Sequence, residues 1–369
     1  MRSLSTLAIL LLLTGGLAFG QAKKGAAKAV TGTTPKFKAI WEPVPFNKDI
    51  ELRDISCVGP ETCWVAGRKS TILFTSDGGK TWKVQLGGDP EATDDDLAEI
   101  HFLDQNHGWV LTERSRVMGT TDGNSWAELG KVPSTSKALQ FISPAVGFVA
   151  DNSDSQTQSH WNRTDNGGKS WTRGNPCSVE TTVAGLARKL GCMIGVAQFV
   201  SPSVGFLAGA APIDMGTSMA FFSKTVDGGA TWNHSVIPDT KHKVDSIHFW
   251  SEKDGLAVLA SGATHWTADG GATWTGSANP PSWRSFYASA GGKMLVGVHA
   301  TGRNIGYSFN GGRSFTSRPA SLPAEPTAVT FYDATHGYLI GRHGMVFRYR
   351  IVPIDYSVPG MFAAAAPPQ

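Results

Sequence analysis

One short phrase recurs along the chain and restricts the folds that the chain can adopt. Four full copies and two looser ones occur: "TSDGGKTW" (75–82), "TDNGGKSW" (164–171), "TVDGGATW" (225–232), "TADGGATW" (267–274), "TTDGNSW" (120–126) and "SFNGGRSF" (308–315). Their final aromatic residues follow one another at intervals of 41 to 45 residues, apart from one interval of 61. A strand-rich period in the low forties is typical of β-propeller blades.

A second repeat gives the number of blades. A phenylalanine followed six residues later by glycine recurs at Phe102/Gly108, Phe141/Gly147, Phe199/Gly205, Phe249/Gly255 and Phe331/Gly337. The last copy has no turn phrase after it, whereas "FKAIWEPVP" near the N-terminus resembles a lone fourth strand with Trp41 at the motif position. We therefore predict an all-β, seven-bladed propeller of four-stranded antiparallel blades, closed by the N-terminal strand, which removes a free sheet edge.

Composition agrees with this fold. Only 17% of the 369 residues are charged, while the chain holds 43 glycines and 12 tryptophans, a mixture that favours short strands and glycine turns over helices. The net charge of +3 gives no argument for a nucleic-acid partner. No phosphate loop, nucleophile elbow or metal-ligand spacing is present, so we expect no cofactor and no metal.

The two ends of the chain are predicted to lie outside the propeller. Arg2, the apolar run at 7–13 and the small residues at 18–20 predict a secretory signal peptide over 1–20. Residues 21–36 are rich in Ala, Lys and Gly and predict a flexible leader; the propeller is expected over 37–353, and 354–369 as a disordered tail. The mature protein is then expected in the periplasm or outside the cell, or in a thylakoid lumen if the source is phototrophic.

Four cysteines suit an exported protein, because oxidising compartments allow disulfides. Three pairings are possible, and the local one is favoured. Cys57 and Cys63 flank the short turn "CVGPETC", while Cys177 and Cys192 bracket an insertion that explains the interval of 61 residues.

The recurring phrase resembles the Asp-box of BNR-type propellers, and its residues have structural roles that chemistry explains. The acid or amide can bond nearby backbone N–H groups, the glycines allow positive φ, and the aromatic residue packs between neighbouring sheets. These structural residues are Asp77, Trp82, Asp122, Trp126, Asn166, Trp171, Asp227, Trp232, Asp269, Trp274, Asn310 and Phe315.

The resemblance extends to a family. "CWVAGRKSTILFTSDGGKTW" in the first blade is similar to the photosystem II stability/assembly factor family, and the similarity covers residues 37–350. This resemblance implies a non-enzymatic assembly factor that holds a membrane-protein subunit through an Arg-rich surface. The sequence departs from the family in its degenerate second box, the insertion between Cys177 and Cys192 and the extra tail.

Candidate partner-binding residues come from the turns between the second and third strands, which lie opposite the Asp-boxes. Consecutive blades six, seven, one and two contribute a basic arc, and blades three and four an acidic sector of Asp151, Asp154 and Asp214. Arginine suits carboxylate recognition through paired hydrogen bonds. The arc consists of Arg68, Lys69, Arg114, Arg116, Arg303 and Arg342. We expect a monomeric protein whose partner is a protein, a subunit of a membrane complex.

The alternative is a carbohydrate-active or carbohydrate-binding propeller that uses its central channel. Alternate residues of each first strand point to the axis, which places Asp54 and Glu99 in adjacent blades as a possible carboxylate pair for glycoside hydrolysis. A wet polar channel accommodates such residues without any catalysis. A carbohydrate-binding module would instead use an exposed aromatic side chain such as Trp283.

Overall fold

The computed structural model describes residues 37–353, apart from gaps at 92–94, 134–135, 153–157, 215, 238–240, 279, 282, 289–291, 293 and 300–303. These residues form one compact unit, Phe37–Pro353. The predicted signal peptide, leader and tail lie outside the described residues. Among the described residues no helix is long and apolar enough to cross a membrane.

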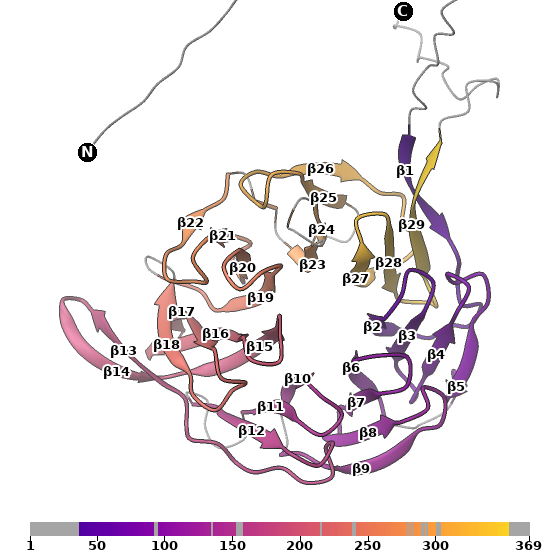
Figure 1. Ribbon diagram of the computed structural model, residues 1–369. Helices are drawn as coiled ribbons and strands as arrows, with labels where there is room; N and C mark the ends of the chain where they lie inside the picture. The colour runs from indigo at the N-terminus through magenta and orange to yellow at the C-terminus, as the bar shows by residue number, and fades with distance from the viewer. Residues whose placement is uncertain are drawn as a thin grey trace, which may run out of the picture. The chain divides into compact units, whose positions relative to one another are not determined.

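The unit is a ring of antiparallel sheets around a central axis (Figure 1), and it confirms the predicted seven-bladed propeller. Within each blade, the strands are numbered from 1, nearest the axis, to 4, at the outer edge. In order, the blades are β2 (Leu52–Cys57), β3 (Cys63–Gly67), β4 (Ile72–Thr75), β5 (Lys83–Leu86); β6 (Leu97–Phe102), β7 (Gly108–Thr112), β8 (Arg116–Thr120), β9 (Ala127–Lys131); β10 (Lys137–Phe141), β11 (Gly147–Asp151), β12 (His160–Thr164); β15 (Met193–Phe199), β16 (Gly205–Asp214), β17 (Thr217–Thr225), β18 (Asn233–Ile237); β19 (Val244–Phe249), β20 (Gly255–Leu259), β21 (Thr264–Thr267), β22 (Thr275–Gly276); β23 (Trp283–Ala288), β24 (Leu295–His299), β25 (Asn304–Ser308), β26 (Thr316–Pro319); and β27 (Pro326–Asp333), β28 (His336–Gly341), β29 (Val346–Pro353), β1 (Phe37–Pro43).

Blade 3 differs from the prediction of four strands. Its sheet holds β10, β11 and β12 only, and the chain that follows Trp171 touches β12 through two isolated bridges, Arg163↔Thr172 and His160↔Pro176. Proline has no N–H to donate to a ladder. The chain then leaves the blade as the hairpin of β13 (Ser178–Val183) and β14 (Leu186–Gly191), which projects from the ring in Figure 1.

Blade 7 joins the two ends of the described chain. β1 pairs with β29 from Phe37↔Pro353 to Pro43↔Phe347, so the sheet order is β1-β29-β28-β27. This pairing covers the edge of β29, which would otherwise present a row of unpaired backbone groups.

The repeated phrases form the turns between strands 3 and 4. In blade 1 the Thr75 hydroxyl donates to Asp77 Oδ1 (2.9 Å), and the amides of Gly79 and Thr81 donate to Thr75 Oγ1 (2.8 Å) and Asp77 Oδ1 (3.0 Å). Gly78 and Gly79 both have positive φ, 74° and 82°, which a side chain would oppose. Two side-chain oxygens therefore bind the backbone of the whole turn.

The core lies between blades, as seven apolar clusters at the seven junctions. Each junction receives one aromatic ring from the motif position of one blade. In order around the ring from blade 1 to blade 7, these rings are Trp82, Trp126, Trp171, Trp232, Trp274, Phe315 and Trp41. Burying a large aromatic side chain stabilises each junction by about 2–3 kcal/mol.

Both predicted disulfides are present, and local pairing is confirmed. Cys57–Cys63 joins β2 to β3, and Cys177–Cys192 closes the base of the β13–β14 hairpin. Neither cysteine pair leaves a free thiol, and the described part of the chain contains no free cysteine.

Candidate functional site

The turns between strands 2 and 3 stand at the end of the ring opposite the phrase-bearing turns, because consecutive antiparallel strands turn alternately at the two ends. We call this end the strand 2–3 face. Arg68 and Lys69 lie in the turn of blade 1, Arg114 and Arg116 in and after that of blade 2, and Arg342 in that of blade 7. Blades 7, 1 and 2 are consecutive around the ring, so these five cations gather on one sector.

The blade 1 turn is held in place by backbone bonds. Lys69 and Ser70 both have positive φ, 59° and 51°, which is uncommon for residues other than glycine. The Arg68 amide donates to Glu51 O at the start of its own blade, and the Ser70 amide to Asp95 O at the start of blade 2 (both 2.9 Å). The turn is therefore pinned to two blades, and the Arg68 side chain starts from a fixed position.

Arg68 forms an ion pair with Asp96, whose carboxylate is more deeply buried. Asp96 Oδ2 accepts a bond from Arg68 Nε (2.8 Å), its Oδ1 accepts one from the Lys69 amide (2.9 Å), and Arg53 Nη2 lies 3.4 Å away. The Asp96 side chain is 11% exposed, whereas that of Arg68 is 49% exposed. Burial opposes ionisation, but these bonds and the charges of Arg53 and Arg68 outweigh it, and the pKa of Asp96 is lowered.

Asp95 has the same role in blade 2. Arg116 donates to its Oδ2 through Nε (3.3 Å) and Nη2 (3.2 Å), and Arg114 Nε lies 3.9 Å from Oδ1. The Asp95 side chain is 2% exposed and that of Arg114 is 71% exposed. In both blades a buried carboxylate therefore lies beneath an arginine whose outer donors reach solvent.

Blade 7 supplies the third arginine of this sector. Arg342 lies between two acids, with Nε 3.4 Å from Glu51 Oε2 and Nη1 3.1 Å from Glu325 Oε2. A hollow of about 300 Å³ separates the turns of blades 7 and 1. Its lining consists of Asp49, Ile50, Glu51, Arg68, Lys69, Arg342 and His343. This hollow is large enough for one side chain or a chain terminus.

The basic arc therefore needs a correction. The sequence predicted a sector of cations with an acidic loop nearby, but the acids lie among the cations and neutralise much of their charge. Six carboxylates of the described residues pair with the arginines of this sector: Glu51, Asp95, Asp96, Glu113, Glu128 and Glu325. What the sector offers is an ordered set of exposed N–H donors. Arg303 and Asp154 lie outside the described residues, and buried Asp151 pairs with Arg173 (3.6 Å).

Arg53 belongs to the sector although the sequence analysis did not select it. It sits in β2 and its guanidinium contacts Glu51, Asp96 and Glu113. The signal was available, since Arg53 precedes the channel residue Asp54 and strand residues alternate in direction. Its three acidic partners come from two blades, and only the closed ring brings them together.

The channel carboxylates bind backbone. Asp54 accepts bonds from the amides of Ile55 (2.9 Å) and, in the next blade, Ile100 (2.8 Å). Glu99 accepts bonds from Ala138 (3.0 Å) and Leu139 (2.8 Å), again in the next blade. Each carboxylate thus links two first strands, a role that explains an acid at this position without catalysis.

Burial affects the protonation of this pair. It is the main cause that raises the pKa of Asp54 to about 7, with the Glu99 charge adding to the effect and the bonds from Ile100 and Ile55 opposing it. Burial likewise raises the pKa of Glu99. A carboxyl group with a raised pKa is what a hydrolase uses as its acid. In this pair, however, all four carboxylate oxygens accept hydrogen bonds from backbone amides, so they bind the protein itself rather than a substrate.

Trp283 was the candidate for a carbohydrate-binding platform. Trp283 is partly buried against Phe315 (5.1 Å between ring centroids) and donates to Thr264 Oγ1 (3.3 Å), so it is not the exposed platform that a carbohydrate-binding module needs. Within the ranges that the structure describes, no group of three His, Cys, Asp or Glu side chains is arranged to hold a metal ion.

No protein-family model matches the sequence. The chain is 22% identical over 331 residues to the photosystem II assembly protein Ycf48 of Synechococcus sp. (strain JA-2-3B'a(2-13)), covering 85% of this chain and 90% of that protein. The resemblance seen in the sequence is confirmed. This chain is a propeller similar to Ycf48.

Solved structures show the same likeness in the fold. YCF48 bound to D1 peptide superposes with a TM-score of 0.62 at 17% identity, covering 84% of this chain and 94% of that one. YCF48 from Cyanidioschyzon merolae gives 0.61 at 16%, covering 84% and 98%. Virginiamycin B lyase from Staphylococcus aureus gives 0.60 at 10%, covering 86% and 100%. An assembly factor and an enzyme thus share this ring, and the fold does not choose between them.

Proposed function

We propose that this chain is an exported, non-enzymatic propeller that binds a subunit of a membrane-protein complex and assists its assembly. The observation that carries the proposal is its similarity to Ycf48 along 85% of its length. One such propeller has a peptide bound, as its description states. A rigid ring that presents an ordered face suits this kind of task.

The binding surface of this proposal is the sector of Arg68, Arg114 and Arg342 on the strand 2–3 face. Arg68 uses only Nε for Asp96, so its two terminal nitrogens have no partner among the described residues. A guanidinium fixed on one side can donate two parallel bonds to a carboxylate on the other, at little entropic cost. The partner is therefore a protein segment that carries carboxylates, either side chains or a chain terminus.

A hydrolytic function is not proposed, because Asp54 and Glu99 already bind the backbone of neighbouring blades. Export is supported by the predicted signal peptide and by the two disulfides, which persist in oxidising compartments. Expression in the native host followed by intact-mass measurement of the purified protein tests this part. A chain that begins near Gln21 is the expected result, and an uncut cytosolic chain contradicts export.

The test of the surface is a pull-down from native membranes with the tagged mature chain. Arg68→Glu/Arg342→Glu reverses two exposed charges of the sector, and Arg188→Glu/Lys189→Glu on β14 is the matched control, since both of its side chains are exposed far from the sector. We expect a membrane-protein partner that the wild type and the control retain and the first variant loses. The same partners with all three proteins would show that the sector is not the binding surface.

A further inference from the structure

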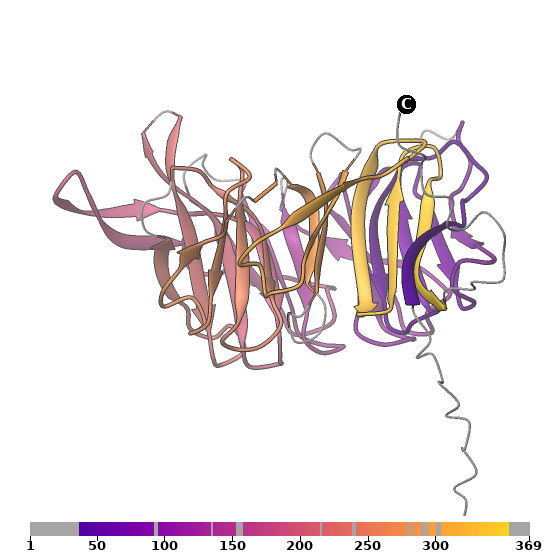
Figure 2. The same cartoon turned by 90° about the horizontal axis from the view of Figure 1, so that it is seen from above.

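Blade 4 departs from the other blades on the strand 2–3 face. Its middle strands β16 and β17 have ten and nine residues, and both extend beyond β15 and β18, the strands that flank them. Pairing with β15 ends at Met193↔Ala210, and pairing with β18 ends at Ala220↔Ile237. The remainder is a two-stranded arm that, drawn in pink, rises above the neighbouring blades in Figure 2.

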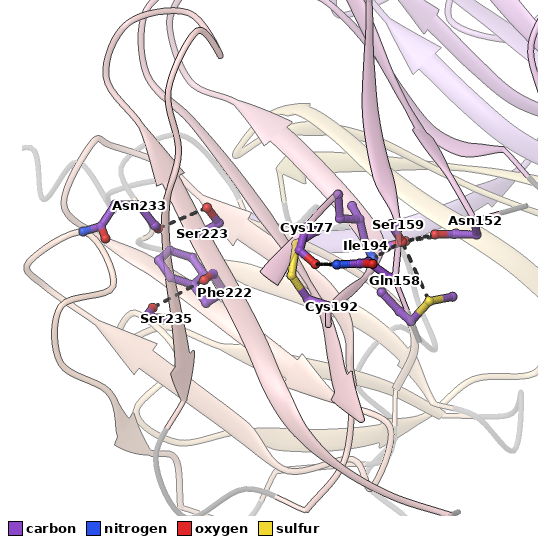
Figure 3. Close-up of a disulfide and its surroundings, with 11 residues drawn as sticks. Asn152, Gln158, Ser159, Cys177, Cys192, Ile194, Phe222, Ser223, Asn233 and Ser235 are labelled. Atoms are coloured by element: carbon purple, nitrogen blue, oxygen red, sulfur yellow. Dashed lines mark hydrogen bonds between the residues drawn. A yellow bond between two sulfur atoms is a disulfide. The ribbon is translucent and has the colours of Figure 1, made fainter. Parts of the chain in front are cut away.

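The arm is braced rather than free. The β13–β14 hairpin places Val179 and Leu190 in the same apolar cluster as Ala211 of the arm, with Ile213 and Met219 packed against it. The Cys177–Cys192 disulfide closes the base of this hairpin (Figure 3). The insertion that interrupts the repeat therefore supports the arm of blade 4.

Ser159 connects the β13–β14 hairpin to the first strand of blade 4 by hydrogen bonds. Its amide donates to Cys192 O and its carbonyl accepts from the Cys177 amide, both at 2.8 Å. Its hydroxyl contacts Asn152 and accepts a bond from the Ile194 amide (2.9 Å), as Figure 3 shows. Ser159 is fully buried. The hairpin, blade 3 and β15 are thus held as one piece beside the arm.

Beside the arm lies a cleft with a volume of about 840 Å³. Its lining includes Met193, Ile194 and Gly195 of β15, Lys137 of blade 3 and Val244 of blade 5. Volumes of 300–1,000 Å³ are typical of binding sites for small molecules and peptide segments. Part of the lining is apolar, and Ile194 and Ile213 belong to the cluster that packs the hairpin against the arm.

The arm does not offer a regular strand edge to the cleft. Alternate residues of a strand turn their backbone to the same neighbour, so Pro212 faces the side on which Ala210 meets Met193. Proline has no N–H, and natural proteins place it on edges to prevent pairing with another strand. A second copy of the arm is therefore a poor occupant, and recognition must rest on side chains.

Four charged side chains line the cleft together with the apolar ones: Lys137, Asp214, Lys243 and Asp245. Lys243 pairs with Asp245 (2.9 Å), which neutralises the blade 5 wall. Lys137 on blade 3 and Asp214 on the arm line the cleft, and neither forms a salt bridge with a described residue. A ligand that contacts both blade 3 and the arm therefore meets a cation at Lys137 and an anion at Asp214.

We propose that this cleft binds an extended, largely apolar peptide segment, with an acidic group at Lys137 and a basic group at Asp214. A peptide fits because it has both charges and apolar side chains along one chain. The proposal rests on the proposed function only in that the ligand is a protein segment. The cleft is separate from the arginine sector, so a partner lying across the strand 2–3 face can occupy both.

Gly195 provides a variant that fills the cleft. A Cβ at this position meets its nearest atoms at 3.7–3.8 Å, which is ordinary contact, and the residue does not have a positive φ. Gly195→Phe should therefore fold and occupy the cleft. Gly276→Phe is the matched control, because a Cβ there meets nothing within 4 Å on the outer strand β22.

The experiment is selection of ten-residue peptides from a displayed random library on the mature protein, followed by measurement of Kd for the selected peptides. We expect apolar peptides with one acidic and one basic end, at least a tenfold loss of affinity in Gly195→Phe, and no change in Gly276→Phe or in Arg68→Glu/Arg342→Glu. Failure of this result while the arginine variant still loses its membrane partner would overturn the cleft alone.

Two further outcomes also decide the matter. Lys137→Glu/Asp214→Lys changes exposed side chains and should select peptides with their charges exchanged; an unchanged selection overturns the proposal even if Gly195→Phe does not fold. Sedimentation velocity tests the competing occupant. If the wild type forms dimers that Gly195→Phe dissociates, the cleft is a contact between copies and the peptide proposal is wrong.

Discussion

Cys57 and Cys63 face each other across β2 and β3 at the position where five other blades place phenylalanine opposite glycine. Those pairs are Phe102↔Gly108, Phe141↔Gly147, Phe199↔Gly205, Phe249↔Gly255 and Phe331↔Gly337. In all five, a Cβ on the glycine would lie 2.4–2.6 Å from the ring of its partner. The disulfide thus replaces a ring that lies over a glycine.

The first prediction follows from this equivalence. Cys57→Ala/Cys63→Ala removes the cross-link without supplying the ring that the other blades have, and the chain-entropy model gives a loss of about 2 kcal/mol for a loop of this size. Cys57→Phe/Cys63→Gly restores the pair that the other blades use, so we expect its melting temperature to exceed that of the alanine variant. Thermal unfolding without reductant, so that the wild type keeps its cross-link, measures both. A less stable Phe/Gly variant would mean that blade 1 cannot accept the ring.

The repeat was predictable because its chemistry is local. Thr225, Asp227 and Gly229 form their turn with one another, so the phrase alone predicts it. The Cys57/Cys63 equivalence was also within reach, since the two residues have the same spacing of six as each Phe and Gly. From the sequence, the cysteines were interpreted only as a disulfide pair. That they occupy the positions of Phe and Gly in the other blades was not predicted.

The rest depended on ring closure. The fourth strand of blade 3 was predicted from the phrase that precedes it, but Pro176 and the insertion take the chain away. Arg68, Arg114 and Arg342 lie in the turns between strands 2 and 3, where the repeat predicted them. The acids that pair with these arginines could not be predicted, because Glu51, Asp96 and Glu325 come from three blades that only the closed ring brings together.

The second prediction concerns the acids of the turns. Bonds from the Thr273 side chain and amide lower the pKa of Asp269 to about 2, against slight burial. Asp269→Ala removes these bonds and should lower the melting temperature by about 2–4 °C. Asp269→Asn should retain most of the stability, because Asn166 and Asn310 form the same turn with amide side chains. Equal losses in both variants would show that the charge itself is required.

These acids also make the stability of the propeller depend on pH in the acid range. Asp77, Asp227 and Asp269 all have pKa values of about 2 in the folded protein, lower than in the unfolded chain. A lowered pKa contributes stability that is complete above the unfolded value and is lost as pH falls toward the folded value. The triple Asp→Asn variant should therefore lose less stability than the wild type between pH 4 and pH 2, as measured by circular dichroism. Parallel curves would contradict this origin.

The third prediction has the opposite sign. The pKa of Asp54 is raised to about 7, so the folded state binds this proton more tightly than the unfolded chain does. Its contribution is complete below the unfolded value near 4 and is lost as pH rises to 7. The stability advantage of the wild type over Asp54→Asn should therefore shrink between pH 4 and pH 7. An advantage that stays constant over this range would show that the pKa of Asp54 is the same in the folded protein and in the unfolded chain.

The fourth prediction separates charge from position in the arginine sector. Asp96→Asn keeps an oxygen for the Lys69 amide but weakens the bonds that hold Arg68 and Arg53. Removing a negative charge should leave the association rate with an acidic partner equal or faster. The less ordered Arg68 should raise the dissociation rate, by about tenfold if one charge-assisted bond is lost. Surface plasmon resonance with the partner from the pull-down measures both rates, and Asp165→Asn on the opposite face, next to Arg163, is the control. A slower dissociation rate in Asp96→Asn would mean that the buried acid only weakens the field of the arginines and does not position them.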